Sequence, residues 1–359
     1  MIPGLTLGII LVPQAMAYGL LAGVDPVFGL YAALVPLAVY TLLASTPHVS
    51  VGPTALASLL CLNGLSGMAD PQTPEYLGLA ILLAALTGLI QLLFGLLRLG
   101  GITSLLSRPV LSGFVSAAAI LIMCSQLDAL LGIPTDRTTY LHQSLAELAK
   151  HAGAWEPATA LFGLSSLLLL FAASRWLPAK FPTMLVLIIL STAVVWAAGE
   201  QWGIATIGEV PAGLPAFALP TLSWDLLLDL LPVAAVLALI SFIETVSIGK
   251  AFNAKHKYYR IQPDRELVAL GMSKIIGSFF QAIPTSASFS RSAVIESSGG
   301  RGPLGNVIAA FLLMLVLLFL TPLFYHLPIT VLAAIIIFSV RKLFDFREMK
   351  RLSRIAPKE

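Results

Sequence analysis

The stretches His48-Val49-Ser50-Val51-Gly52-Pro53-Thr54 and Pro284-Thr285-Ser286-Ala287-Ser288-Phe289-Ser290-Arg291-Ser292 are short polar interruptions in a very apolar chain. In the first, polar or small residues alternate with valines, which predicts a strand, and Pro53 then opens an apolar run to Leu65 that predicts a helix. In the second, serines recur at every other position before a short run that stops at Gly299-Gly300, so a strand again precedes a short helix. Helices of roughly twelve residues or fewer are well short of the ~20 residues needed to cross a bilayer. We therefore expect two half-helices, each beginning at membrane depth.

A helix that begins inside a membrane leaves polar backbone groups away from water. Such broken backbone is tolerated only where it lines a cavity enclosed by protein. The free N–H groups and the positive end of the helix dipole attract anions, and discontinuous helices that face one another near the midplane are typical of secondary transporters. The two stretches therefore predict an anion carrier.

The composition places the chain outside the range of soluble domains. Of its 359 residues, 58% are hydrophobic and 11% are charged, which predicts an all-α polytopic membrane protein. Cys61 and Cys124 both lie in predicted spans, so no disulfide scaffold is expected. The sequence carries no Gly-x-Ser-x-Gly, His-Glu-x-x-His or paired intramembrane aspartate signature, which argues against an intramembrane enzyme. No cofactor or metal is predicted.

Apolar runs and their breaks predict twelve membrane crossings, at residues 3–22, 28–45, 48–65, 77–98, 107–132, 158–174, 182–198, 229–250, 264–282, 284–299, 304–325 and 327–341. With a cytoplasmic N-terminus, basic residues gather in the cytoplasmic connections and acidic residues in the external ones, which is the positive-inside pattern. If either half-helix were a loop, the orientation of every later span would be reversed and this asymmetry of charge between the two sides would be lost. Both half-helices are therefore expected to cross the membrane. A short amphipathic helix is expected in the long external connection of 133–157.

The two half-helices are the third and tenth predicted crossings. Because an odd offset reverses orientation, they predict an inverted repeat about an axis in the membrane plane. Residues 1–226 would form the first repeat, of seven spans, and residues 227–359 the second. The second is incomplete, because two further spans would be needed after Arg341 and the chain stops at Glu359.

Ionisable residues inside spans cost at least ~2.5 to 3.5 kcal/mol each, so Glu244, Arg291 and Glu296 require an explanation. Arg291 lies at the N-terminus of the second half-helix, where its charge adds to the positive end of the dipole, a conflict that an anion would resolve. A salt bridge to Glu244 or Glu296, or snorkelling, is the alternative. Glu244 has apolar neighbours and is a candidate for proton or sodium coupling, or for pairing with Arg291. For Glu296 a structural role is favoured.

Three further polar residues, Gln14, Tyr18 and His48, are candidates for a functional role, but the sequence signal for each is less specific. Gln14 and Tyr18 share a helix face after Pro13 and could line the pocket with a donor and an aromatic wall. For Tyr18 alone, packing or an interfacial position is the commoner case. His48 lies beside a predicted cytoplasmic turn, which favours a capping or surface role.

Four motifs in order along the chain carry a resemblance: Pro13-Gln14-Ala15-Met16-Ala17-Tyr18, Asp25-Pro26-Val27-Phe28-Gly29-Leu30-Tyr31, His48-Val49-Ser50-Val51-Gly52-Pro53 and Phe289-Ser290-Arg291-Ser292. Together they resemble the sulphate permease (SulP) family of anion transporters. The resemblance implies two inverted seven-span repeats arranged as a core and a gate domain, with the anion between the half-helices. It assigns substrate binding to Gln14, Tyr18, Thr54, Phe289, Ser290 and Arg291, and ion coupling to Glu244. Departures from the family pattern are the missing cytoplasmic leader, the missing last two spans and the missing C-terminal STAS domain.

The function expected from residues and resemblance together is secondary active transport of a small anion by alternating access. Sulphate, a dicarboxylate such as fumarate, and bicarbonate are the candidate substrates, with a proton as the coupling ion, in a bacterial inner membrane with the N-terminus cytoplasmic. The alternatives are a sodium-coupled bicarbonate carrier, a nucleobase carrier of the same architecture and an anion-binding membrane protein without transport. A homodimer is one expected assembly, and no nucleic-acid partner is expected.

Overall fold

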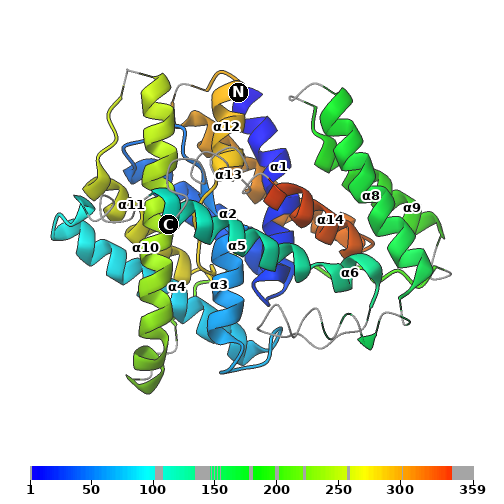
Figure 1. The fold of residues 1–359 in the computed structure, drawn as a ribbon. Helices are drawn as coiled ribbons and strands as arrows, with labels where there is room; N and C mark the ends of the chain where they lie inside the picture. Colours follow the sequence, from blue (N-terminus) through cyan, green and yellow to red (C-terminus); the bar gives the residue numbers. More distant parts are fainter. Residues whose placement is uncertain are drawn as a thin grey trace.

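A computed structural model describes residues 2–101, 108–133, 155–177, 181–198, 202–220, 224–256, 259–300 and 302–341, with a few single residues between 146 and 153. The fold is helical, as expected, and Figure 1 shows its elements in sequence colours. The longer helices are α1 (Ile2–Leu21), α2 (Pro26–Leu43), α4 (Pro74–Leu96), α5 (Arg108–Cys124), α8 (Pro157–Trp176), α9 (Thr183–Ala198), α10 (Trp224–Lys255), α11 (Pro263–Ser278), α13 (Leu304–Leu315) and α14 (Ile329–Val340). Six described helices of at least 18 residues are apolar enough to cross a membrane.

The two predicted strand-then-helix units are present, and they pair with each other. Strand β1 (Val51–Gly52) leads into α3 (Ala55–Leu65), and β2 (Ser286–Ala287) leads into α12 (Phe289–Ser297). The strands are antiparallel, with Val51 opposite Ala287 and Gly52 opposite Ser286. A further backbone bond from Ser288 N to Ser50 O (3.0 Å) extends the pairing. The pairing satisfies backbone N–H and C=O groups that would otherwise be unpaired at membrane depth. The paired backbone groups before each half-helix therefore need no water as a partner.

The helices form two groups. Helices α1 to α4 and α10 to α13 pack on one another, and α5, α6 (Leu127–Leu131), α8 and α9 pack around α14 in a second group. In Figure 1, α6, α8, α9 and α14 lie to the right of α1, α4, α10 and α11 lie to the left, and α5 runs across the middle of the view. Helix α1 contacts both groups, through α13 and α2 on one side and α14 and α9 on the other. This division corresponds to the expected core and gate.

The predicted span 107–132 is not one helix. Helix α5 ends at Cys124, a turn follows at Ser125 and Gln126, and α6 occupies only Leu127–Leu131. The predicted span 304–325 also changes character, because α13 ends at Leu315 and continues as a π-helical turn η3 (Val316–Leu320) and a 3-10 turn η4 (Thr321–Phe324). The apolar runs in the sequence do not predict such changes, since a segment has the same hydropathy whether it forms an α-helix, a π-helix or a 3-10 helix. The amphipathic helix expected within 133–157 falls almost wholly outside the described residues.

Two connections between the helix groups are joined to each other. The segment 202–220 leads from α9 to α10, and residues 325–328 lead from η4 to α14. Backbone bonds run from Ile207 N to Leu327 O (2.9 Å), from Gly208 N to Tyr325 O (3.1 Å) and from Ile329 N to Ala205 O (3.0 Å). These two connections are therefore joined by an antiparallel bridge between Thr206 and Pro328, so a movement of one connection is transmitted to the other.

The contact between α1 and α2 depends on a missing side chain at Gly29. A Cβ at this position would collide with the carbonyl oxygen of Ala15 and lie 3.1 Å from the Cα of Gly19. Small residues of this kind let membrane helices approach closely.

We predict that Gly29→Ala lowers stability by ~1–3 kcal/mol, because the added methyl group must push α1 and α2 apart. Thermal unfolding of the purified protein in detergent measures the effect. Gly67→Ala is the matched control, since a Cβ there meets nothing within 4 Å. Equal melting temperatures for the two variants would contradict the close helix contact.

Candidate anion site

The strand pairing brings the N-termini of the two half-helices together. Thr54 caps α3 and accepts a hydrogen bond from the Ala57 N–H (3.3 Å), and Ser288 caps α12 and accepts one from the Arg291 N–H (3.5 Å). Both caps have extended backbone, which is the usual conformation at this position. The positive ends of two helix dipoles therefore lie at the same place, and an anion there would interact favourably with both.

Arg291 connects the two half-helices. Its side chain is completely buried, and its Nη1 donates to the carbonyl oxygen of Pro53 at 2.9 Å. Its Nε and Nη2 have no hydrogen-bond partner in the described part of the chain. Gly52 leaves room for the guanidinium, because a Cβ at Gly52 would lie 3.3 Å from Nη2. A buried charged group with unused donors requires an acceptor.

The salt bridges considered as an alternative for Arg291 do not form. Among the described residues, Arg291 makes no ion pair with Glu244 or Glu296, and Glu296 instead pairs with His256. Among the described residues, no carboxylate therefore takes up the unused donors of Arg291.

A cavity of about 230 Å³ lies at the two helix N-termini. It includes Tyr18 of α1, the α3 cap, Glu244 of α10, the start of α12 and Ser339 of α14, so it lies where the two helix groups meet. The lining residues are Tyr18, Thr54, Ala55, Leu56, Glu244, Ser247, Ile248, Ala287, Ser288, Phe289, Ser290, Ser339 and Val340. Of the expected site residues, the cavity brings together Tyr18, Thr54, Glu244, Phe289 and Ser290.

Gln14 and Arg291 are not among the residues that line this cavity. Gln14 is buried, its Nε2 lies 3.8 Å from Met184 Sδ, and its Oε1 has no hydrogen-bond partner among the described residues. It faces α9 of the second helix group. Phe289 lines the cavity and is also 56% exposed, with its ring stacked on Phe252 at 5.6 Å.

A second hollow, of about 650 Å³, is larger, and Asp128 and Glu156 are the charged residues among those that line it. The smaller cavity also contains a carboxylate, that of Glu244, and neither described lining includes a Lys or Arg. The smaller cavity includes the caps of both half-helices, Thr54 and Ser288, and the larger one does not, so the smaller cavity is the candidate anion site.

Glu244 contacts the strand that leads into α12. The Ser286 hydroxyl donates to Glu244 Oε2 at 2.5 Å, and Ser286 belongs to β2. The carboxylate is thereby linked through Ser286 to the strand that leads into α12, the helix that would hold the anion.

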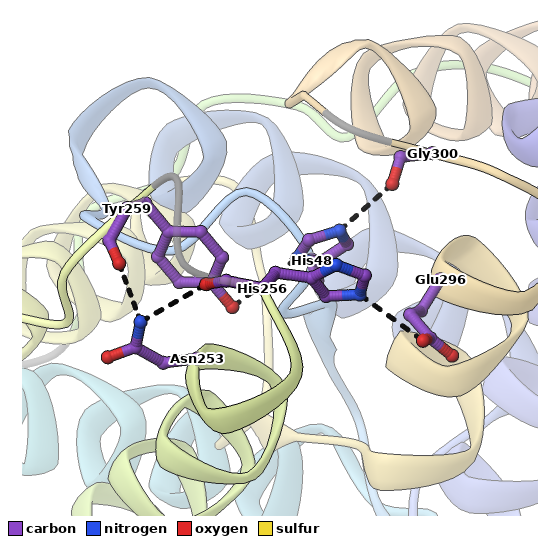
Figure 2. A network of polar contacts seen from close by, with 6 residues as sticks. All are labelled: His48, Asn253, His256, Tyr259, Glu296 and Gly300. Carbon is purple, nitrogen blue, oxygen red and sulfur yellow. Dashed lines mark hydrogen bonds and ion pairs between the residues drawn. The ribbon is translucent and has the colours of Figure 1, made fainter.

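His48 has a different role from the one expected. It is completely buried, not at the surface, and its Nε2 forms a hydrogen bond with Gly300 O at 2.9 Å (Figure 2). Its ring stacks on that of His256 at 4.9 Å, and His256 Nε2 pairs with Glu296 Oε1 at 3.2 Å. This network ties the end of α12 to the residues before β1 and to the end of α10. Of the capping or surface role expected for His48, the surface alternative is wrong, because the loop lies against the end of α12 and buries the ring. Glu296 has the structural role expected for it.

The sequence interpretation missed Lys274. This residue lies on α11 in the predicted span 264–282, and it is 1% exposed. Its Nζ donates to Gln91 Oε1 of α4 at 2.8 Å. The rule applied to Glu244 and Arg291, that an ionisable residue inside a span requires an explanation, would have found it.

The fold and the site define the class of protein: a helical membrane protein whose two half-helices meet at their N-termini beside a buried arginine. The chain belongs to the sulfate permease family, whose family model matches it over residues 1–359. Similar proteins include sulfate transporter 4.1 (chloroplastic) of Arabidopsis thaliana, 38% identical over 365 residues that cover 98% of this chain and 52% of that protein. A probable sulfate transporter of Mycobacterium tuberculosis is 34% identical over 357 residues, which cover 99% and 63% respectively.

Two solved structures have the same fold. One is SLC26A9, at 25% sequence identity and a TM-score of 0.91 over 99% of this chain and 59% of that chain. The other is the transmembrane domain of a cyanobacterium bicarbonate transporter, BicA, at 26% identity and a TM-score of 0.87 over 98% and 90%. This chain spans about half to two thirds of the length of its curated relatives. The expected fold is confirmed, and the family and these relatives are transporters, not enzymes, as the sequence predicts.

Proposed function

We propose that this protein transports a small oxyanion or carboxylate by alternating access, with the anion held by Arg291, Ser290 and the half-helix N–H groups. The observation that carries the proposal is the buried Arg291 guanidinium, whose Nε and Nη2 have no partner in the described chain. A small anion supplies acceptors for both. The relatives named as sulfate and bicarbonate transporters support sulphate and bicarbonate as candidates, and fumarate tests a dicarboxylate.

The location of the cavity supports an alternating mechanism. It lies between the first helix group, which carries α3, α10 and α12, and Ser339 and Val340 of the second group. Movement of one group past the other would change which end of the cavity is open. We propose that residues 1–226 and 227–359 are inverted repeats, and β1 and β2 pairing antiparallel supports this. Thr54, Tyr18 and Phe289 would shape the site, and Gln14 would act at the boundary with α9.

We propose a proton as the coupling ion and Glu244 as the group that carries it. Glu244 lines the cavity and shares a hydrogen bond with the strand before Arg291, so its charge and the occupancy of the site affect each other. A bacterial inner membrane with a cytoplasmic N-terminus, and a homodimer, complete the proposal.

The test is uptake of radiolabelled sulphate, fumarate and bicarbonate into proteoliposomes, with and without an inward proton gradient. We expect the gradient to stimulate uptake of at least one anion in the native protein. Glu244→Gln should reduce this uptake to the level without a gradient, because the amide cannot bind and release the proton. Glu296→Gln is the control, since Glu296 lies in the His256 network outside the cavity, and it should keep the stimulation.

Other outcomes separate the alternatives. No gradient effect on any anion would exclude proton coupling. Thermal stabilisation by an anion without any flux would indicate an anion-binding protein that does not transport.

A further inference from the structure

The segment that leads into the first half-helix holds the second one at its start. The Ser50 carbonyl oxygen accepts from the Ser288 N–H (3.0 Å), and the Pro53 carbonyl oxygen accepts from Arg291 Nη1 (2.9 Å). In the first turn of α12, the Ser292 hydroxyl accepts from the Ser50 N–H (3.0 Å). The start of α12 is therefore fixed to the first strand-then-helix unit.

His48, at the beginning of the same segment, holds the other end of α12 (Figure 2). Its Nε2 donates to the carbonyl oxygen of Gly300 at 2.9 Å, since a carbonyl oxygen only accepts. Gly300 is itself wound onto the end of the helix, because its N–H donates to the Ile295 carbonyl oxygen (2.9 Å). The His48 side chain is completely buried, so water does not compete for this bond. One segment therefore fixes α12 at both ends.

A second contact at this end of α12 is more exposed. Glu296 pairs with His256 at 3.2 Å, and both side chains are partly exposed. Ion pairs that water reaches contribute little, whereas the loss of a buried hydrogen bond is costly. His256 also stacks on the ring of His48 at 4.9 Å, which keeps that ring in place (Figure 2). We therefore expect the end of α12 to depend more on His48 than on Glu296.

The direction of α12 decides where its first N–H groups point. The first bond within the helix runs from Ser292 N to Ser288 O (3.0 Å), so the N–H groups of Phe289 and Ser290 have no acceptor inside the helix. These groups point along the helix axis, out of its N-terminus. A helix of nine residues is ~14 Å long and behaves as a rigid rod. If its far end were released, the rod would be free to pivot about its start, and these donors would lose their fixed direction.

We propose that His48 is a positioning residue of the anion site: through Gly300 it fixes the direction of α12 and so directs the N–H groups of this half-helix at the anion. The role at the anion rests on the anion binding proposed above. His48 does not line the cavity, so it acts through the position of α12 and not by contact with the anion.

His48→Asn and His48→Gln test this proposal as a matched pair of amides. The Gln amide nitrogen reaches about as far as Nε2 and can still donate to Gly300 O, whereas the Asn amide is one methylene shorter and cannot. Equilibrium dialysis measures the affinity for whichever of sulphate, fumarate and bicarbonate stabilises the native protein most, well below each melting temperature. We expect binding about fivefold or more weaker in His48→Asn, and within about twofold of native in His48→Gln. Equal affinities of the two variants would overturn the proposal.

Gly271→Ala is the control for a general loss of stability. A Cβ at Gly271 would lie 2.6 Å from Leu92 N and 2.7 Å from Gly88 O, so the added methyl group pushes α4 and α11 apart and lowers the melting temperature. Gly271 does not line the cavity, and this variant should bind the anion like the native protein. If it lost affinity as His48→Asn does at an equal loss of melting temperature, the effect of His48 would be one of stability, and the proposal would be wrong.

Hydrogen exchange tests the position of α12 without any anion. Backbone amides of residues 289–300 should exchange about fivefold or more faster in His48→Asn than in His48→Gln, while those of α3 exchange at equal rates. Equal exchange of residues 289–300 in the two variants would overturn the role of His48. If the native protein bound none of the three anions and the exchange were as expected, the proposed function would fail, and the hold of His48 on α12 would stand.

Tyr259→Phe covers the case in which His48→Asn does not fold. The Tyr259 hydroxyl lies 3.4 Å from Nδ1 of His48, so its removal frees the ring to turn away from Gly300. We expect the same two changes, of about twofold or more, in anion affinity and in the exchange of residues 289–300. Native values of both would overturn the proposal.

Discussion

Arg291→Ala is expected to weaken anion binding about 100-fold or more, because hydrogen bonds to charged groups contribute ~1.5–3 kcal/mol each. Two donors of the guanidinium, Nε and Nη2, are without a partner in the described chain and would both be lost. Binding is measured by equilibrium dialysis with whichever of sulphate, fumarate and bicarbonate stabilises the native protein most.

Two variants show whether the loss is specific. Arg291→Lys keeps the positive charge but loses the planar guanidinium with its paired N–H donors, so this variant should bind the anion with intermediate affinity. Arg265→Ala is the matched control, since Arg265 also donates to a backbone carbonyl, that of Leu43 (2.8 Å), but lies exposed and away from the cavity. It should bind like the native protein. Native affinity in Arg291→Ala would remove Arg291 from the site.

Glu266→Ala is expected to lower stability by ~3–5 kcal/mol, because several buried donors lose their acceptor and each unsatisfied buried donor costs ~1–3 kcal/mol. Glu266 is completely buried at the start of α11. It accepts from the Tyr40 hydroxyl (2.5 Å), from both the N–H (2.9 Å) and the hydroxyl (2.5 Å) of Ser45, and from Thr46 Oγ1 (3.2 Å). One carboxylate thus fastens the end of α2 to α11, and its loss leaves several donors unpaired.

Thermal unfolding in detergent measures this effect. Tyr40→Phe removes one of the donors and leaves the carboxylate bound to Ser45 and Thr46, so its loss should be smaller. Glu296→Gln breaks the partly exposed pair with His256 and should cost no more than ~1 kcal/mol. A melting temperature for Glu266→Ala that equals that of Glu296→Gln would show that Glu266 does not hold the helices together.

The half-helices could be predicted because they rest on local chemistry. The alternation of residues 48–52 and the serines of residues 286–292 specify extended backbone, and the short apolar runs that follow specify short helices. Thr54 and Ser288 cap them as such residues usually do. Arg291 and Glu244 were singled out by the cost of a charge in a membrane, by the position of Arg291 at the start of the second half-helix and by the family resemblance. Their roles at the site remain predictions.

The prediction failed where the answer depends on residues far apart in the chain. A capping or surface role was expected for His48, because a histidine beside a turn usually has one of these, and nothing local indicates that Gly300 and His256 contact it and bury it. The break between α5 and α6 was missed because Ser125 and Gln126 interrupt an apolar run too briefly to be recognised. The expected pocket position of Gln14 remains a proposal, since its amide faces Met184.

Local patterns alone predict a membrane protein with two half-helices and a cation at the start of the second, because hydropathy, helix length and capping are properties of neighbouring residues. What each charged group contacts depends on the packing of distant segments. Arg291 donates to the Pro53 carbonyl beside the paired strands, and Gln91 of α4 joins Lys274 of α11 to Ser241 of α10. These contacts join residues separated by 238 and 183 positions, and such partners are chosen by packing, which no local pattern records.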